Sequence, residues 1–261
     1  SDDILIKFNI NGVEKINNNT YSLTNINYEL NSPKTAENFC EYNKNNGHCR
    51  LKGTLTFNES IIFESKTIIE PGTKIIINQG GNLIFNSSVV MKGSKEMPIN
   101  IEGNNTGGIY IKNDKEQISV IQNSNFYNLA TMDSLLRRYT GSINGYGGTF
   151  NLKNVSIKNG NAEDQLNIID AKVNISGLKI NDAISDAFDC DFCEGTISDI
   201  VLENVGGDGL DISGSNLNII RMDAKYIKDV YKRFHKKELV NFPLFEFKDQ
   251  LRYNKLNIEQ I

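Results

Sequence analysis

The segments DQLNIID (164–170), DAFDCDF (186–192) and DGLDISG (208–214) decide the fold of this chain. Their first residues are 22 positions apart, and the same interval separates each later residue from its counterpart in the next segment. A fixed period of this length is typical of a solenoid, in which each repeat buries its apolar side only by stacking on its neighbour.

Apolar residues alternate with other residues inside each segment, as expected for a half-buried strand. The positions predicted to point inward are Leu166, Ile168, Phe188, Cys190, Leu210 and Ile212. The opposite parity is predicted to point outward and holds Asn167, Asp189 and Asp211, with Ile169, Asp191 and Ser213 two places further on. Strands in register place equivalent side chains about 4.8 Å apart. Asp189 and Asp211 are therefore predicted to be outward-facing neighbours, with Asp191 beside them.

The rest of the chain predicts an all-β fold with two end segments. Short β-branched segments separated by Gly, Asn or Pro run from Leu51 to Ala224, without an amphipathic helix. We expect 1–50 to be an N-terminal capping segment, 51–224 to be a parallel β-helix, and 225–261 to be a C-terminal helical cap or tail. Asn or Asp recurs at one corner of the repeat, and its members are Asn128, Asn159, Asp182 and Asn204. These residues are predicted to form a ladder at a turn.

The segment 226–240 has apolar residues at helical spacing and several basic residues after them. We expect an α-helix that caps the last rung. The alternative is that its basic side binds a protein partner in the cell envelope.

The repeat spacing is broken once. Phe126 and Ile157 occupy equivalent inward positions but are 31 residues apart, which predicts an insertion around Met132 to Tyr139. Insertions in repeat proteins often form the binding face. The candidate substrate-binding residues are Arg137, Arg138, Tyr139, Tyr146 and Asn167.

Composition excludes some functions. A formal charge of −4 and a pI near 5.4 argue against broad nucleic-acid binding, which needs a basic face. No apolar run reaches the roughly 20 residues of a transmembrane helix. Cys40 and Cys49 lie in a polar stretch where a disulfide is plausible, which suggests an oxidising compartment. Cys190 and Cys193 form a C-x-x-C pattern that is weak as a zinc signal, and Cys190 is interpreted as a buried apolar thiol.

Several segments together resemble a known superfamily. LIFNSSVVMKGSKEMPINIEG (83–103), GGIYIKN (107–113) and the rungs VSIKNG (155–160), LKINDA (178–183) and VLENVG (201–206) resemble the right-handed parallel β-helix of the pectin-lyase-like superfamily. The triple AEDQLNII, SDAFDCDFCEGTI and GGDGLDISGS is similar to a β-helix region of bacterial envelope proteins, some of which accompany spore-coat H-like modules. This resemblance implies the fold over roughly 51–224, but the superfamily includes enzymes, tailspikes and adhesins.

The catalytic patterns of the superfamily's enzymes do not transfer. The polygalacturonase-like pattern needs adjacent Asp residues and Gly-His-Gly, which neither His48 nor His235 provides. The pectate-lyase-like pattern needs an Arg base, and no Arg occurs on the rungs between Asn151 and Ile220.

The acids allow several interpretations. Asp164, Asp186 and Asp208 begin their strands, where Asp commonly accepts backbone N–H bonds. Asp189, Asp191 and Asp211 form a solvated face, a site for Ca²⁺ or glycan, or a catalytic acid and base with a third acid that tunes them.

The sequence therefore predicts a secreted, periplasmic or cell-surface protein that acts on a polysaccharide. The first hypothesis is a lyase or hydrolase that uses Asp189 and Asp211 with Asp191. The second is a non-catalytic glycan- or protein-binding module, such as an adhesin or a structural part of a larger envelope protein. No cofactor is certain, and Ca²⁺ is the one that the acids suggest.

Overall fold

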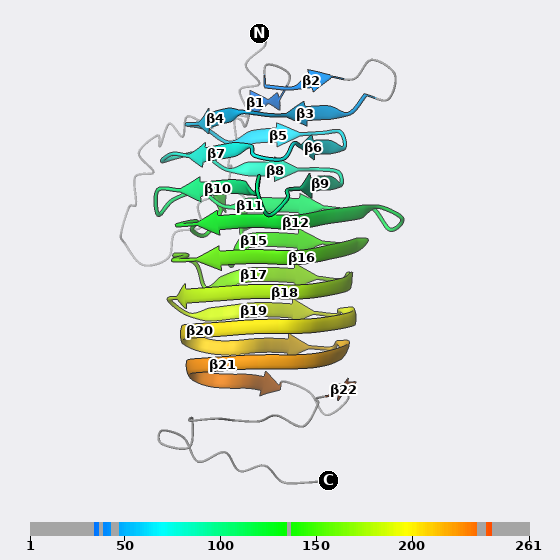
Figure 1. The fold of residues 1–261 in the computed structure, drawn as a ribbon, viewed down its shortest axis with the longest axis vertical. Helices are drawn as coiled ribbons and strands as arrows, with labels where there is room; N and C mark the ends of the chain where they lie inside the picture. Colours follow the sequence, from blue (N-terminus) through cyan, green and yellow to red (C-terminus); the bar gives the residue numbers. More distant parts are fainter. Residues whose placement is uncertain (1–33, 37–38, 43–46, 135–136, 234–238, 242–261) are drawn as a thin grey trace, which may run out of the picture. The chain divides into compact units, whose positions relative to one another are not determined.

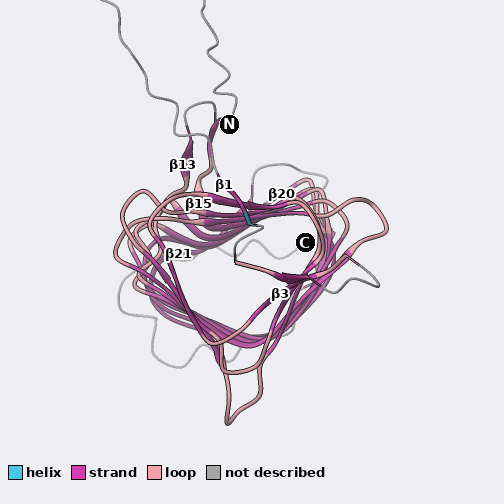
Figure 2. Ribbon diagram, turned by 90° about the horizontal axis from the view of Figure 1, so that it is seen from above, coloured by secondary structure: helices cyan, strands magenta, loops and turns pink. Residues whose placement is uncertain are grey.

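The computed structural model describes residues 34–36, 39–42, 47–134, 137–233 and 239–241. The chain winds into a β-helix of about 8 turns, and the strands of successive turns pair in parallel (Figure 1). Viewed along its axis, the coil has three faces (Figure 2). Buried apolar side chains fill its interior. We call these faces A, B and C, and the chain visits them in that order in each turn.

Face A contains the stretch that decides the fold. Its members are β1 (Lys34–Thr35), β5 (Ile61–Phe63), β8 (Leu83–Phe85), β11 (Ile109–Lys112), β15 (Gly141–Tyr146), β17 (Asp164–Ile169), β19 (Asp186–Asp191), and the last parts of β20 (Glu194–Ser213) and β21 (Asn216–Arg233).

Face B is formed by strands that follow the next corner. Its members are β3 (Cys49–Leu51), β6 (Thr67–Ile69), β9 (Val89–Lys92), β22 (Leu239–Asn241), and the first parts of β12 (Ile118–Tyr127), β16 (Thr149–Lys158), β18 (Lys172–Ala183), β20 and β21.

Face C closes each turn. Its members are β4 (Thr54–Phe57), β7 (Lys74–Ile77), β10 (Ile99–Gly103), the second parts of β12, β16 and β18, and the middle parts of β20 and β21. A short antiparallel pairing of β2 (Glu41–Tyr42) with β3 precedes the first complete turn.

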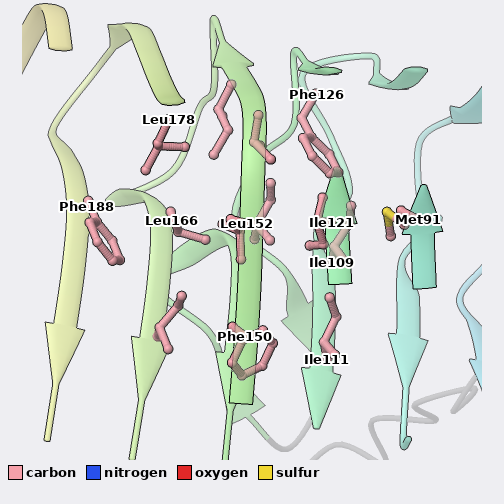
Figure 3. Packing of buried hydrophobic residues seen from close by; sticks show 14 of the residues in the cluster. Met91, Ile109, Ile111, Ile121, Phe126, Phe150, Leu152, Leu166, Leu178 and Phe188 are labelled. Carbon is pink, nitrogen blue, oxygen red and sulfur yellow. The ribbon is translucent and has the colours of Figure 1, made fainter. Parts of the chain in front are cut away.

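The core consists of columns of apolar side chains that point inward from all three faces (Figure 3). Phe188, Cys190, Leu210 and Ile212 are fully buried, as their parity predicts. The Phe63 and Phe85 rings stack from adjacent rungs with centroids 4.7 Å apart. Because each rung covers the apolar side of its neighbour, the columns supply the main stabilisation of the coil.

The predicted corner ladder is confirmed. Asn128, Asn159, Asp182 and Asn204 all adopt the left-handed conformation, with φ between 53° and 58°. Asn and Asp tolerate this region better than other non-glycine residues. Asn204 Nδ2 donates to Asp182 Oδ1 at 2.9 Å, so one contact of the ladder joins two rungs.

The insertion is also found where the spacing predicts it. β13 (Asp133–Ser134) and β14 (Arg137–Arg138) form an antiparallel pair outside the coil. Figure 2 shows this hairpin projecting outward beside β15 on face A.

The predicted C-terminal helix is wrong over 226–233, and the described residues contain no α-helix. This segment is the end of β21, where Ile227 pairs with Val205 and Tyr231 with Leu210. The preceding rung offers a complete edge of backbone partners, and β-branched and aromatic residues suit that edge. Residues 1–33 and 242–261, on which the predicted caps partly rest, lie outside the described residues. Among those described, no helix is long and apolar enough to cross a membrane.

The first prediction concerns the core columns. Phe188→Ala is expected to lower the free energy of unfolding by about 3–5 kcal/mol, because it leaves a cavity between stacked rungs. Phe192→Ala is the matched control, since Phe192 is 64% exposed, and is expected to cost less than about 1 kcal/mol. Chemical denaturation followed by circular dichroism measures both; equal losses would contradict the stacked core.

Candidate functional site

The acidic residues of face A lie at a point where the strand parity changes. Asp164 pairs with Asp186, the next residues Gln165 and Ala187 are skipped, and pairing resumes at Leu166. Gln165 and Ala187 are fully buried. Because one residue is skipped, residues three apart lie on the same outer side. The Asn167 Nδ2 atom accordingly donates to Asp164 Oδ2 at 3.2 Å.

This change of parity joins the two acidic columns that the sequence separates. One column is Asp164, Asp186 and Asp208, and the other continues from Asn167 through Asp189 to Asp211. Carboxylate oxygens of Asp186, Asp208 and Asp211 lie within 4.8 Å of one another. We call Asp164, Asp186, Asp189, Asp208 and Asp211 the acidic cluster.

In the first column, Asp186 accepts a backbone N–H bond of the kind predicted for an Asp at the start of a strand. Asp186 Oδ1 accepts the backbone N–H of Asp208 at 2.8 Å and lies 3.3 Å from the Ser185 hydroxyl. Asp164 and Asp208 are buried, with 4% and 7% of their surface exposed. Asp186 therefore binds the backbone of the next rung and also belongs to the acidic cluster.

Asp189 differs most from an ordinary carboxyl group. Burial is the largest cause that raises its pKa, and with the charges of Asp191, Asp164, Asp211 and Asp186 it brings the pKa to about 8. Burial also raises the pKa of Asp164 to about 6, although hydrogen bonds from Thr140 and Asn167 oppose this. Asp189 is thus mostly protonated at neutral pH, beside other carboxylates.

The three predicted outer acids are only partly grouped as expected. Asp189 and Asp211 are register neighbours on adjacent rungs, as predicted. Asp191 lies one column away, in the column of Tyr146 and Ile169. The grouping within 4.8 Å includes Asp186 and Asp208 instead of Asp189 and Asp191. Lys232 follows Asp211 in its column, and its side chain lies outside the described part of the structure.

The inserted hairpin contacts the same face of the coil. The Tyr139 ring packs against Tyr110 with centroids 4.7 Å apart, and Thr140 Oγ1 accepts a hydrogen bond from Asn167 Nδ2 at 2.6 Å. The hairpin therefore leads into β15, two rungs before Asp189, and Thr140 contacts the rung between them. Tyr146 is 41% exposed on this face. The backbones of Arg137 and Arg138 form β14, but their side chains are outside the description.

A second feature is an open groove on face B, which the sequence analysis missed. Two open hollows of about 510 and 440 Å³ share Asn174 and Thr196, so they form one groove across the rungs. Besides Asn174 and Thr196, its outward-facing lining consists of Thr149, Lys172, Glu194, Asn216, Asn218, Val120, Gln122, Asn151, Lys153, Ser176 and Ser198. The signal was present in the sequence, because Lys172, Glu194 and Asn216 are 22 residues apart.

Both cysteine pairs form disulfides. Cys40 and Cys49 are bonded, with Cα atoms 5.0 Å apart. Cys190 and Cys193 are also bonded to each other, so the interpretation of Cys190 as a free thiol is wrong. Both Cys190 and Cys193 are buried, and their Cα separation of 5.9 Å is usual for a disulfide.

The parallel pairing of successive rungs defines the chain as a parallel β-helix. No protein-family model, curated protein or solved structure matches the chain.

The second prediction follows from Asp189. Its folded-state pKa of about 8 exceeds the ordinary value of 3.8, so the folded state holds a proton that the unfolded state has already lost. This contribution to stability is complete below about pH 4 and is lost as the pH rises towards 8. Asp164 loses its contribution by about pH 6. Between pH 6 and 8, with a chelator present, Asp189→Asn is expected to flatten the decline in unfolding free energy.

Chemical denaturation at several pH values measures this effect, and Asp223→Asn on face C is the charge-matched control. The histidines contribute equally to all three proteins, so the difference between profiles isolates Asp189. Parallel profiles for wild type and Asp189→Asn would contradict the raised pKa.

Proposed function

We propose that this protein binds an extracellular polysaccharide along the groove on face B, as a non-catalytic surface module. The observation that carries this proposal is the continuity of the two hollows through Asn174 and Thr196. Amide, hydroxyl and charged side chains line the groove, and such groups form hydrogen bonds with sugar hydroxyls.

The dimensions of the groove favour a linear polymer over a compact ligand. Its lining side chains repeat every rung, about 4.8 Å apart. The rungs from Gln122 to Ser198 therefore offer the same kind of contact several times along one line. A chain of similar sugar units has a matching repetition, and several weak contacts add up when they are linked.

The disulfides support a location outside the reducing cytosol. Bonds such as Cys40–Cys49 and Cys190–Cys193 persist mainly in secreted, periplasmic or cell-surface proteins. A polysaccharide of the envelope or of the surroundings is therefore the class of ligand that we infer.

The third prediction tests the groove. Lys172→Ala combined with Asn218→Ala removes two exposed contacts from face B, and is expected to weaken polysaccharide binding at least about tenfold. Affinity electrophoresis against acidic and neutral polysaccharides gives the measurement.

The control replaces Lys158 and Lys179 by Ala, because both are exposed on face C. The control variant should bind as wild type does. Equal binding by the groove variant and wild type would remove face B as the binding surface, and the absence of any polysaccharide ligand would sink the proposal.

A second candidate function is hydrolysis of a glycosidic bond at the acidic cluster. Asp189 and Asp211 are register neighbours, so their carboxyl groups are about 5 Å apart, a spacing compatible with a retaining mechanism. In this mechanism Asp189 donates its proton to the leaving oxygen, while Asp211 attacks the sugar carbon and forms a glycosyl ester. The Asp189 carboxylate then takes a proton from a water molecule that attacks the same carbon and releases Asp211. The raised pKa of Asp189 suits the role of acid.

The fourth prediction decides between the two candidates. If the cluster is catalytic, wild type releases reducing sugar from a polysaccharide, and Asp189→Asn slows this release by at least about 100-fold. Asp223→Asn should leave the rate unchanged. Binding without release of reducing sugar would exclude hydrolysis and leave the binding module.

A further inference from the structure

We propose that Phe192 is a stacking subsite for a sugar ring at the edge of the groove on face B. This inference rests on the proposed binding of a polysaccharide, and it adds the class of sugar, one that presents a ring face made of C–H groups. Phe192 lies at the corner between faces A and B, after β19 and before β20. None of the described residues that line the groove is aromatic.

Phe192 borders the groove on two rungs. Glu194, two residues further along the chain, lines the groove, and Asn216 lines it on the next rung. Cα atoms two residues apart are at most about 7 Å apart. The Phe192 ring also lies over Gly214, because a Cβ atom at that glycine would be 2.7 Å from two carbon atoms of the ring. Gly214 precedes Asn216 by the same two residues, so the ring lies beside the groove on both rungs.

The loop that carries Phe192 is held in place before any ligand arrives. The Cys190–Cys193 disulfide closes this loop, and both cysteines are buried. The Phe192 N–H group donates to the Ser213 carbonyl at 2.8 Å, and the Cys193 N–H group donates to Ser215 Oγ at 2.7 Å. A residue that is fixed in this way loses little conformational freedom on binding, which favours affinity.

The conformation at this corner does not favour Phe. Phe192 has a φ of 55°, and the residues at the same corner of other rungs, Gly147, Asp170 and Gly214, also have positive φ. Gly and Asp tolerate this conformation, whereas a bulky side chain is disfavoured there. Phe192 is also 64% exposed, so its ring contributes little to the core. Because the stability of the fold does not account for Phe192, a role in binding does.

Tyr226 shows that exposure and conformation alone do not define the subsite. It is 76% exposed and has a φ of 54°, but it lies at the corner between faces C and A, across the coil from the groove. Phe192 differs from it in having the groove beside it and a disulfide around it. Tyr226 is therefore the matched control.

The chemistry of a sugar ring suits this pairing of an aromatic side chain with a groove. Hydroxyl groups surround the edge of the ring, and C–H groups form its faces. An aromatic ring that stacks on such a face removes apolar surface of both partners from water. Polar side chains such as Glu194 and Asn216 can then bind the hydroxyl groups at the edge. The sugar must therefore have at least one ring face without an axial hydroxyl group.

The fifth prediction is that Phe192→Ala weakens polysaccharide binding about tenfold, because an aromatic contact is lost. Phe192→Tyr keeps the ring and is expected to bind within about threefold of wild type. Tyr226→Ala should bind as wild type does. Affinity electrophoresis against soluble β-glucan, hyaluronate and polygalacturonate gives the measurement, and circular dichroism checks that each variant is folded.

A fluorescent variant tests the contact directly. The chain contains no Trp, so Phe192→Trp introduces a single indole at the subsite. Its emission is expected to shift to shorter wavelength when the bound polysaccharide is added, because the indole leaves water. Tyr226→Trp is expected to show no shift.

Stability separates binding from packing. Asn tolerates the left-handed conformation, so Phe192→Asn is expected to unfold at a higher temperature than wild type while it binds polysaccharide about tenfold more weakly. A residue that serves only the packing of the fold would give the opposite pair of results, a lower unfolding temperature with unchanged binding.

The outcomes distinguish this inference from the proposed function. Wild-type binding by Phe192→Ala, or equal emission shifts in the two Trp variants, would overturn the subsite and leave the groove. Weak binding by Phe192→Ala with normal binding by the Lys172→Ala and Asn218→Ala double variant would support the subsite and remove the groove. If wild type binds none of the three polysaccharides, both proposals are wrong.

Discussion

Parallel pairing in register between successive turns is the constraint on which this structure depends. It fixes which residue lies above which, so a sequence interval of 22 becomes a column of side chains about 4.8 Å apart. Columns that point inward make the core, and columns at corners collect Asn and Asp in the left-handed conformation. The same rule gathers like charges, which a globular fold normally disperses. Both candidate sites of this protein are columns that point outward.

The sequence predicts much of the fold because columns can be read directly from the period. The inward positions around Phe188, the corner ladder and the insertion after Phe126 all follow from spacing. The predicted helix failed because Ile227, Val230 and Tyr231 fit both helical spacing and a strand, and the neighbouring rung decided between the two. The spacing of apolar residues within a segment carries no information about the strand 22 residues earlier with which the segment pairs.

The candidate site was less accessible to sequence reasoning. Strict alternation places Asp164 and Asn167 on opposite sides of a strand, whereas the skipped pair Gln165 and Ala187 brings them together. No particular residue type marks the position that leaves the pairing, because it is Gln165 on one rung and Ala187 on the next. The sequence period therefore predicts which acids share a column, while the arrangement of the two columns depends on one backbone irregularity.

The disulfides have a mechanical consequence. The bonded residues are 9 and 3 positions apart, shorter than the 22-residue period, and the chain has only these four cysteines. Each covalent bridge therefore closes a loop inside a single coil and leaves neighbouring coils unlinked. Tension applied along the axis would meet only hydrogen bonds and packing, and would peel the solenoid open one layer at a time.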